Sequence, residues 1–270
     1  MTIPKRYFRA LTIAGSDSGG GAGIQADIKT FSALGVYGMS VITALTAQNT
    51  KGLKGVCCID PEFVYLQMEA VLEDIGADAV KTGMLCNDGV IDAVAKGIKR
   101  FGVKNLVIDP VMLAKDGREL LETPAVEALK TELLPLAAVV TPNIPEAEHM
   151  SGLPIRAKAD MARAAEKILA FGPRAVVIKG GHLENGENED LLMLANGKIM
   201  EFGGSMLSTP NKHGTGCTFA SAIAALLAKG KKIPDAVKGA KEYINLAIAA
   251  GSGYKTGAGW GPVHHFHEFW

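Results

Sequence analysis

The chain has 270 residues, of which 48% are hydrophobic and 21% are charged, an ordinary composition for one large α/β domain with a well-buried core. Lysine and arginine together number 28, as do aspartate and glutamate, so the formal net charge is zero. A neutral chain offers no general attraction to nucleic acid or to an anionic membrane. The N-terminal apolar run is too short to cross a bilayer, which predicts a buried first strand in a cytoplasmic protein.

The four cysteines are Cys57, Cys58, Cys86 and Cys217. None forms a CxxC pair, and four cysteines in a chain of this length do not make a disulfide framework. Cys57 and Cys58 stand together in a strand-like segment. We therefore expect both to be buried as small hydrophobic side chains.

Strand-like apolar runs alternate with helical patterns along the whole chain. A hairpin is predicted at Asn196-Gly197, between two short apolar segments. The other predicted strands are 8–15, 41–45, 55–59, 77–83, 105–112, 137–143 and 174–181, and the predicted helices are 24–34, 61–76, 89–101, 126–134, 159–172, 216–228 and 234–250.

This alternation predicts right-handed βαβ units and an α/β fold in which helices cover both faces of a mostly parallel central sheet. No repeat, low-complexity segment or linker interrupts the pattern, so residues 1–270 are predicted to form a single domain. Ligands of such sheets bind at the carboxyl ends of the strands. Polar or glycine-rich motifs follow several of these ends, namely GSDSGGGAG, KTGM, DPVM, TPNIPE and KGGH.

The first motif, over residues 15–27, is a glycine-rich turn between a strand and a helix. Glycines allow close approach of a ligand, and a helix N-terminus favours an anion. A dinucleotide fingerprint fails on spacing, because a GxGxxG begun at Gly19 would end at Ile24. A phosphate-binding GxxxxGK[ST] motif fails as well. The alternative is a tight turn with no ligand.

The segment KHGTGCTFASAIAALLAKG (212–230) is more specific. Gly214, Thr215 and Gly216 lead into an alanine-rich helix, whose free amides can surround a phosphoryl group during transfer. Cys217 stands in the first turn, where a helix N-terminus lowers a thiol's pKa, so a thiolate could accept a proton from a substrate hydroxyl. The alternative is a buried cysteine behind a glycine turn.

Three oxygen-bearing side chains follow predicted strands and suit Mg²⁺, which prefers oxygen ligands and keeps several waters. They are Asp109, Asn143 and Glu146. Capping of a helix by Asn143, with Glu146 in its first turn, is the alternative, and both can hold at once. Lys179 ends another strand, where it could reach a nucleotide phosphate or simply face solvent.

The C-terminal segment GPVHHFHEFW contains His264, His265 and His267. The pattern invites a zinc interpretation, but no cysteine lies near and HxH alone is weak. A packed aromatic tail is the preferred interpretation.

Taken in order, several motifs make the chain resemble bacterial hydroxymethylpyrimidine/phosphomethylpyrimidine kinases of the ribokinase-like superfamily. They are AGSDSGGGAGIQADIKTFSALGVYGMSVITALTAQNT, KTGML, DPVML, TPNIPEA, KGGH, HGTGCTFASAIAA and the GPVHHFH tail. The resemblance covers nearly the whole chain and implies a three-layer ribokinase-like sandwich. It also implies that Gly214, Thr215 and Gly216 form the anion hole, with Cys217 as the catalytic base.

The same resemblance implies the residues that contact the substrate. Gln48 matches the position that contacts the pyrimidine, where many members have glutamate; Gly15, Asp27, Met84 and Val111 match residues that line the substrate. An amide can pair with both a ring nitrogen and an exocyclic amine.

On the nucleotide side, the resemblance implies that Lys179 and Asn143 lie near the nucleotide and that Glu146, with Asp109, positions Mg²⁺. The implied reaction uses ATP to convert 4-amino-5-hydroxymethyl-2-methylpyrimidine to its monophosphate and then to its diphosphate, in thiamine biosynthesis. The family is commonly homodimeric. The alternatives are a pyridoxal or pyridoxine kinase, an enzyme of dual specificity, and a non-catalytic ligand-binding regulator.

Overall fold

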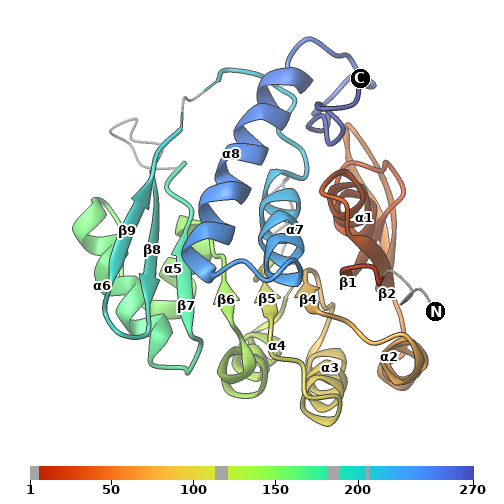
Figure 1. The fold of residues 1–270 in the computed structure, drawn as a ribbon, viewed down its shortest axis with the longest axis vertical. Helices are drawn as coiled ribbons and strands as arrows, with labels where there is room; N and C mark the ends of the chain where they lie inside the picture. The colour runs from red at the N-terminus through yellow and green to blue at the C-terminus, as the bar shows by residue number, and fades with distance from the viewer. Residues whose placement is uncertain (1–5, 113–120, 182–188, 205–206) are drawn as a thin grey trace, which may run out of the picture.

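The computed structural model describes residues 6–112, 121–181, 189–204 and 207–270. Within them, nine strands form one sheet in the order β3-β2-β1-β4-β5-β6-β7-β8-β9 (Figure 1). Neighbours from β2 to β7 are parallel, whereas β3, β8 and β9 pair antiparallel. His182, the last residue of the KGGH motif, lies outside these ranges.

The strands form at the apolar runs of the sequence, and the predicted hairpin forms between β8 and β9. The strands are β1 (Arg9–Asp17), β2 (Tyr37–Asn49), β3 (Gly52–Cys58), β4 (Ala79–Thr82), β5 (Leu106–Ile108), β6 (Val139–Val140), β7 (Ala175–Ile178), β8 (Asp190–Leu194) and β9 (Ile199–Phe202).

Helices cover both faces of the sheet, which confirms the predicted three-layer α/β sandwich. Helices α1, α7 and α8 pack on one face over an alanine-rich core, and α2 to α6 pack on the other over a core rich in larger aliphatic side chains. The bounds are α1 (Gly23–Ala33), α2 (Pro61–Asp74), α3 (Asp88–Arg100), α4 (Thr123–Ala128), α5 (Ile144–Ser151), α6 (Lys158–Leu169), α7 (Thr215–Ala228) and α8 (Ile233–Gly251). Among the described residues, no helix is both long enough and apolar enough to span a membrane.

The helix predicted over 126–134 is not continuous. Helix α4 gives way to a π-helical turn at Leu129–Leu133 and then to a 3-10 turn at Leu134–Leu136. Pro135 lies in this last turn and lacks the N–H that an α-helix needs at this position, which explains the change of helix type.

The prediction that Cys57 and Cys58 are buried is wrong. Both lie on β3, an edge strand whose outer side faces solvent, and both are exposed. Cys58 forms a disulfide with Cys86, with 6.1 Å between their Cα atoms. The sequence spacing of 28 residues gave no indication of this pair, because it depends on how β3 and the loop after β4 meet.

The hairpin formed by β2 and β3 reaches beyond the rest of the sheet. Strand β2 pairs with β1 only as far as Thr46, and beyond it Gln48 and Asn49 pair with β3 alone. The hairpin tip therefore projects above the carboxyl ends of the parallel strands, close to the C-terminal segment (Figure 1).

Candidate active site

A cavity of about 680 Å³ lies at the carboxyl ends of β1, β4, β5, β6 and β7, between the β2–β3 hairpin and helices α7 and α8. Every site residue predicted from the sequence except Asp27 lines it. The lining residues from that set are Gly15, Gln48, Met84, Asp109, Val111, Asn143, Glu146, Lys179, Gly214, Thr215, Gly216 and Cys217.

The turn at the start of α7 enters the middle of this cavity. Gly214 is the N-cap with φ +78°, a left-handed conformation that favours glycine, and a side chain there would overlap the carbonyl oxygen of Gly21. The first amides of a helix have no partner within it. A Cβ on Gly216 would lie only 3.4 Å from Lys179 Nζ and 3.5 Å from Asp109 Oδ2. The turn thus packs directly against that charged pair.

Lys179 and Asp109 form an ion pair of 3.0 Å, with 18% and 4% of their side chains exposed. Thr141 Oγ1 lies 3.4 Å from Asp109 Oδ1. Burial lowers the pKa of Lys179, but the carboxylates of Asp109 and Glu146 outweigh burial and raise it. Lys179 is therefore a half-buried, charged lysine that faces the cavity, and the solvent-facing alternative does not hold.

Asn143 and Glu146 form a capping box at the start of α5. Glu146 N donates to Asn143 Oδ1 at 2.9 Å, and Asn143 N donates to Glu146 Oε2 at 2.8 Å. Both residues also line the cavity. Burial raises the pKa of Glu146 to about 7; Lys179 opposes this shift and Asp109 adds to it. No group of three or more histidine, cysteine, aspartate or glutamate side chains within the described ranges is placed to hold a metal alone.

Cys217 lines the cavity in the first turn of α7. The expectation that its pKa is lowered is wrong in direction. Burial raises the pKa of the thiol to about 11. The charge of Lys81 opposes this rise in pKa, and the charges of Asp27 and Asp109 add to it. Desolvation of the thiolate outweighs the field of the helix terminus here. The raised pKa favours the protonated thiol of Cys217 at neutral pH.

Asp27 does not line the cavity, and direct contact with a substrate does not fit its position. It is fully buried, and its carboxylate pairs with Lys81 Nζ at 2.9 Å and accepts hydrogen bonds from Thr12 and Ser221, each at 2.6 Å. Helix α1 turns Asp27 inward, toward β1 and α7. Lys81 itself does line the cavity, so Asp27 holds a cation beneath the floor near Cys217.

Asp17 explains the glycine-rich turn before α1. Its carboxylate accepts hydrogen bonds from the amides of Gly19, Gly21 and Ala22 at 2.8 to 3.1 Å. Burial raises the pKa of Asp17, but its bond to His213 and these amides outweigh burial and lower it. The amides that could have bound a phosphate are therefore occupied by the chain's own carboxylate, and the tight-turn interpretation holds.

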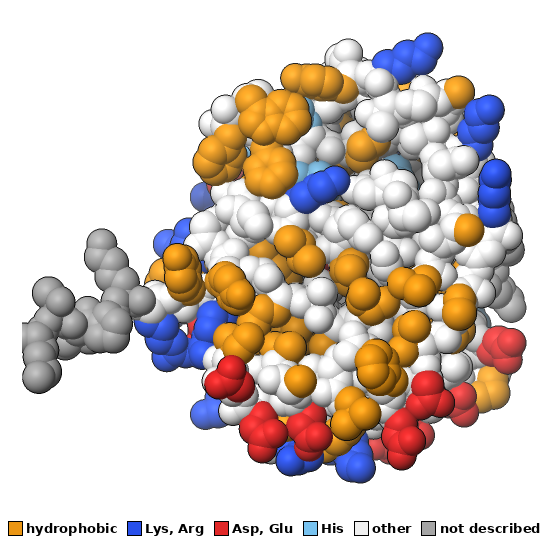
Figure 2. All heavy atoms as spheres, turned by 90° about the vertical axis from the view of Figure 1, so that its right-hand side faces the viewer, with side chains coloured by type: hydrophobic (Ala, Val, Ile, Leu, Met, Phe, Trp, Pro, Cys, Tyr) orange, Lys and Arg blue, Asp and Glu red, His pale blue; other side chains and the backbone are white. Residues whose placement is uncertain are grey.

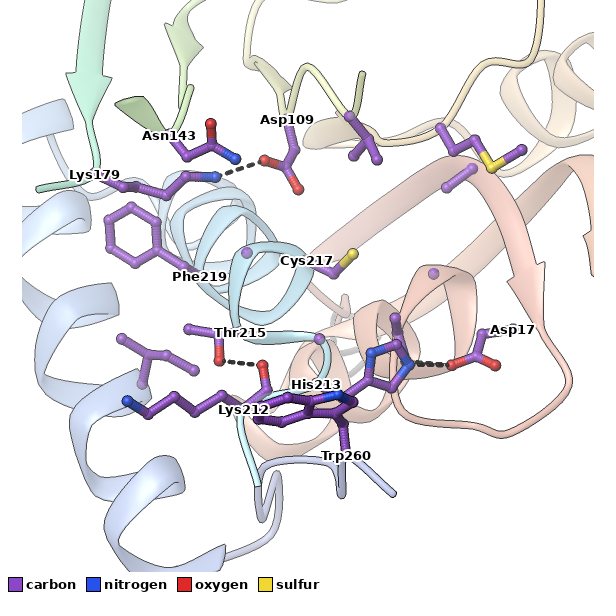
Figure 3. A pocket seen from close by; sticks show the side chains of 18 of the residues that line it. Asp17, Asp109, Asn143, Lys179, Lys212, His213, Thr215, Cys217, Phe219 and Trp260 are labelled. Atoms are coloured by element: carbon purple, nitrogen blue, oxygen red, sulfur yellow. Dashed lines mark hydrogen bonds and ion pairs between the residues drawn. The ribbon is translucent and has the colours of Figure 1, made fainter. Parts of the chain in front are cut away.

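Asp17 also links this turn to the hairpin. His213 Nε2 lies 2.8 Å from Asp17 Oδ2 and 3.4 Å from Gln48 Nε2. In Figure 3 the His213–Asp17 pair and the Lys179–Asp109 pair lie on opposite sides of Cys217. The sequence had shown no role for Asp17 or His213, because their contact joins segments 196 residues apart.

The far end of the cavity is bounded by α8. Lys241 Nζ pairs with Asp190 Oδ2 at 2.8 Å, and Asp190 Oδ1 accepts from the amide of Gly180 at 3.0 Å. Apolar and amide side chains complete this end: Phe219, Ile244, Asn245 and Ile248. The sequence had predicted α8 as a helix, but it had no motif to place one face of it at a site.

The C-terminal tail packs as the aromatic interpretation expected. The His264 ring lies 4.5 Å from that of Trp270 and 5.1 Å from that of Tyr254. His265 Nε2 lies 3.1 Å from Thr218 Oγ1, on the helix turn that carries Cys217. Burial lowers the pKa of His265 to about 3, so the ring is neutral and part of the core.

Comparison with known proteins identifies the family of this chain. Residues 17–264 match the family described as phosphomethylpyrimidine kinase. This chain belongs to that family. A hydroxymethylpyrimidine/phosphomethylpyrimidine kinase of Rhizobium meliloti (strain 1021) is 53% identical over 262 residues, which are 97% of this chain and 98% of that protein.

Solved structures of kinases share the fold of this family member. A crystal structure of phosphomethylpyrimidine kinase from Clostridium difficile 630 is 48% identical, with a TM-score of 0.80 over 89% of this chain and 99% of that one. Pyridoxal kinase from Staphylococcus aureus, in complex with AMP-PCP and pyridoxal, is 36% identical, with a TM-score of 0.89 over 98% of this chain and 96% of that one. The chain is thus a kinase of the ribokinase-like fold.

Proposed function

We propose that this kinase uses ATP to phosphorylate the hydroxymethyl group of 4-amino-5-hydroxymethyl-2-methylpyrimidine, and then phosphorylates the monophosphate, as a cytoplasmic enzyme of thiamine biosynthesis. The observation that carries the proposal is the position of the α7 turn. It lies between the Lys179–Asp109 pair on one side and the His213–Asp17 pair with Gln48 on the other. A phosphoryl group held by this turn would pass from one side to the other.

The side with Gln48 suits the pyrimidine. Gly15, Met84 and Val111 line the same cavity, and a Cβ on Gly15 would lie 3.4 Å from Met84 Sδ. The cavity therefore combines the polar side chain of Gln48 with small and apolar surfaces, a combination that can orient a flat ring. The pyridoxal kinase relative is described with both a nucleotide analogue and a ring substrate, which supports two ligands in one cavity.

The side with Lys179 and Asn143 suits the nucleotide phosphates. Lys179 is kept charged by Asp109 and Glu146, and the apolar face of α8 can receive a base. Phosphoryl transfer depends mainly on positioning and on charge stabilisation. The amides of Gly214, Thr215 and Gly216 would take that second role by donating to the oxygens of the transferred group.

The residues present also fit Mg²⁺ carried by a nucleotide. The negative charge of Asp109 adds to the raised pKa of Glu146, and a cation bound by both carboxylates would relieve that repulsion. Mg²⁺ usually takes one or two carboxylates and completes its shell with water and phosphate. Glu146 and Asp109 would hold it, and it would supply charge to the ATP phosphates.

We propose that Cys217 accepts the proton of the substrate hydroxyl. Its thiol lies in the same turn as the anion-hole amides, and Lys81 is the cation that favours its thiolate. Because the pKa of Cys217 is about 11, the thiolate is scarce at neutral pH, so turnover should rise with pH. The competing possibility is that the hydroxyl loses its proton late, to the phosphate itself.

Turnover of two ring substrates tests the assignment. The purified protein with ATP and Mg²⁺ should phosphorylate the hydroxymethylpyrimidine with a higher kcat/KM than pyridoxal, and mass spectrometry should detect the monophosphate before the diphosphate. A higher kcat/KM for pyridoxal would make it a pyridoxal kinase. Binding of the pyrimidine without any transfer from ATP would instead support a non-catalytic regulator.

We also propose that two copies associate as a homodimer. Large apolar side chains are 40 to 57% exposed on β2, β3 and α2, namely Tyr37, Leu45, Val56, Phe63 and Leu66. Figure 2 shows a band of hydrophobic side chains across this side of the molecule. Monomers rarely leave such a patch uncovered, and β3 is a sheet edge.

Sedimentation velocity tests this interface. Leu66→Glu should convert a dimer to a monomer, whereas Leu246→Glu, at an equally exposed leucine on α8, should leave the dimer intact. A parent protein that sediments as a monomer at micromolar concentration would refute the proposal.

A further inference from the structure

The segment 257–262, called the strap here, joins two walls of the cavity that are far apart in the sequence. On one side it contacts Thr50, at the tip of the β2–β3 hairpin. Trp260 N donates to Thr50 O at 2.8 Å, and Gly259 N donates to Thr50 Oγ1 at 3.2 Å. Figure 1 shows the hairpin tip beside the C-terminal segment. The strap therefore fixes the hairpin from outside the sheet.

On its other side the strap contacts the segment that leads into the anion-hole turn. His213 N donates to Gly261 O at 3.0 Å, and His213 forms a parallel bridge with Pro262. His213 directly precedes Gly214, the N-cap of α7. One short segment thus holds both the hairpin that carries Gln48 and the turn that carries Cys217.

The glycines of the strap are required by these contacts. A side chain on Gly257 or Gly259 would overlap Thr50, and one on Gly261 would overlap the Asn211 side chain. By contrast, a Cβ on Gly253, a few residues earlier, would meet nothing within 4 Å. The backbone of the strap lies against its partners with no room for a methyl group.

Hydrogen bonds also connect the ends of the strap to helix α8. The Asn211 side chain, which lies against Gly261 of the strap, donates from Nδ2 to Gly251 O at 2.8 Å and to Tyr254 O at 2.6 Å. One side chain therefore contacts both the strap and the end of α8. After the strap, His264 N donates to Ala247 O at 3.0 Å. The aromatic tail packs beyond it. The strap is therefore anchored to α8 at both ends.

Trp260 places the strap at the mouth of the cavity. Its side chain is 53% exposed and lines the cavity together with Thr50, Lys212 and His213. Figure 3 shows the Trp260 ring beside Lys212 and His213, on the side of the α7 turn away from Lys179. A ring substrate bound near Gln48 would therefore lie on the side of the cavity that Trp260 borders.

We propose that the strap is a clasp that positions Gln48 against the anion-hole turn, with Thr50 and the amides of Gly259 and Trp260 as its positioning groups. This inference rests on the proposed kinase function. It implies that loosening the clasp separates the ring from the phosphoryl group. Recognition of the pyrimidine and the rate of transfer should then fall together, while binding of ATP at the α8 end is retained.

Gly259→Ala tests the clasp, and Gly253→Ala, between α8 and the strap, is the matched control. Because a displacement of about 1 Å can cost about 10²-fold, we expect kcat/KM for the pyrimidine to fall about 10²-fold in Gly259→Ala. The KM for ATP should change less than about twofold, and Gly253→Ala should match the parent. Equal losses for both substrates would mean a general structural defect and would overturn the proposal, as would parent-like kinetics in Gly259→Ala.

A further variant and a second measurement keep the test decisive if Gly259→Ala does not fold. Thr50→Ala removes the Oγ1 acceptor but keeps the backbone bond, so a smaller loss in the same direction is expected. Amide hydrogen exchange of 48–53 and 211–217 should accelerate in Thr50→Ala and not in Gly253→Ala.

The exchange measurement needs no substrate, so it separates the two ideas. A parent that fails to phosphorylate the pyrimidine would refute the proposed function while exchange still reported on the clasp. Unchanged exchange in Thr50→Ala, together with unchanged pyrimidine kinetics, would refute the clasp alone.

Discussion

Two glycine-rich turns lead into helices at this cavity, and only one of them folds around a carboxylate of the chain itself. The turn before α1, called the closed turn here, folds around the carboxylate of Asp17, which accepts from three of its amides. The turn before α7, called the open turn here, contains no acidic residue and packs against Lys179 and Asp109. Glycine content alone therefore does not identify an anion site. The two turns differ in whether a carboxylate of the chain itself binds the amides.

The largest effect is expected at Cys217, in the open turn. A positioned general base contributes about 10²–10⁴-fold, so Cys217→Ala should lower turnover by that range. With Mg²⁺ saturating and pH between about 8 and 10, the parent's turnover should rise with pH toward the pKa of about 11, and that of the variant should stay flat. Cys57→Ser is the control, at an exposed free cysteine.

Alkylation of the thiols tests Cys217 in a second way. Because Cys57 is exposed and burial raises the pKa of Cys217, a thiol reagent at neutral pH should modify Cys57 first, and activity should survive that first modification. Parent turnover in Cys217→Ala would end the assignment of Cys217 as base and leave late proton transfer to the phosphate.

The next effect concerns Glu146, beside the open turn. Its pKa is raised to about 7 by burial, so the proton competes with Mg²⁺ below neutrality. The Mg²⁺ concentration for half-maximal turnover should rise as pH falls from about 8 to 6, up to about tenfold. Glu146→Gln should lower turnover strongly and remove this dependence, whereas Glu148→Gln on the same helix should keep it. A folded Glu146→Gln variant with parent turnover would reduce Glu146 to a helix cap.

A smaller effect is expected at Gln48, on the side of the closed turn. Loss of a hydrogen-bond partner for a buried polar group costs about 1–3 kcal/mol. Gln48→Ala should therefore weaken binding of the pyrimidine by about that amount and leave ATP binding nearly unchanged, as measured by calorimetry. Asn49→Ala, at the next and exposed residue of β2, is the control. Equal affinity for the pyrimidine in parent and variant would remove Gln48 from the site.

The sequence predicted most of the sheet, both helical layers and the lining of the cavity, since these follow from local periodicity and from motifs at strand ends. It failed where a property depends on distant packing. Asp27 was expected at the substrate, but the inward face of α1 pairs it with Lys81. The pKa of Cys217 was expected to fall, but burial raises it, and Asp27 and Asp109 add to the rise. Burial and long-range pairing are properties of the assembled layers.

The smallest effect tests the closed turn itself. Asp17→Ala leaves three amides without their acceptor, which should lower the free energy of unfolding by about 1–3 kcal/mol. Asp17→Asn, which keeps the shape but not the charge, should lose less, and Asp92→Asn, on the exposed face of α3, should lose nothing. Because the pKa of Asp17 is lowered in the folded chain, its contribution is fully present above the ordinary carboxyl pKa of about 4 and is lost as pH falls through the folded value. Urea titrations of parent and Asp17→Asn should therefore differ at pH 6 and converge as the solution is acidified. A constant difference across that range would mean that shape, and not the charge on Asp17, keeps the turn closed.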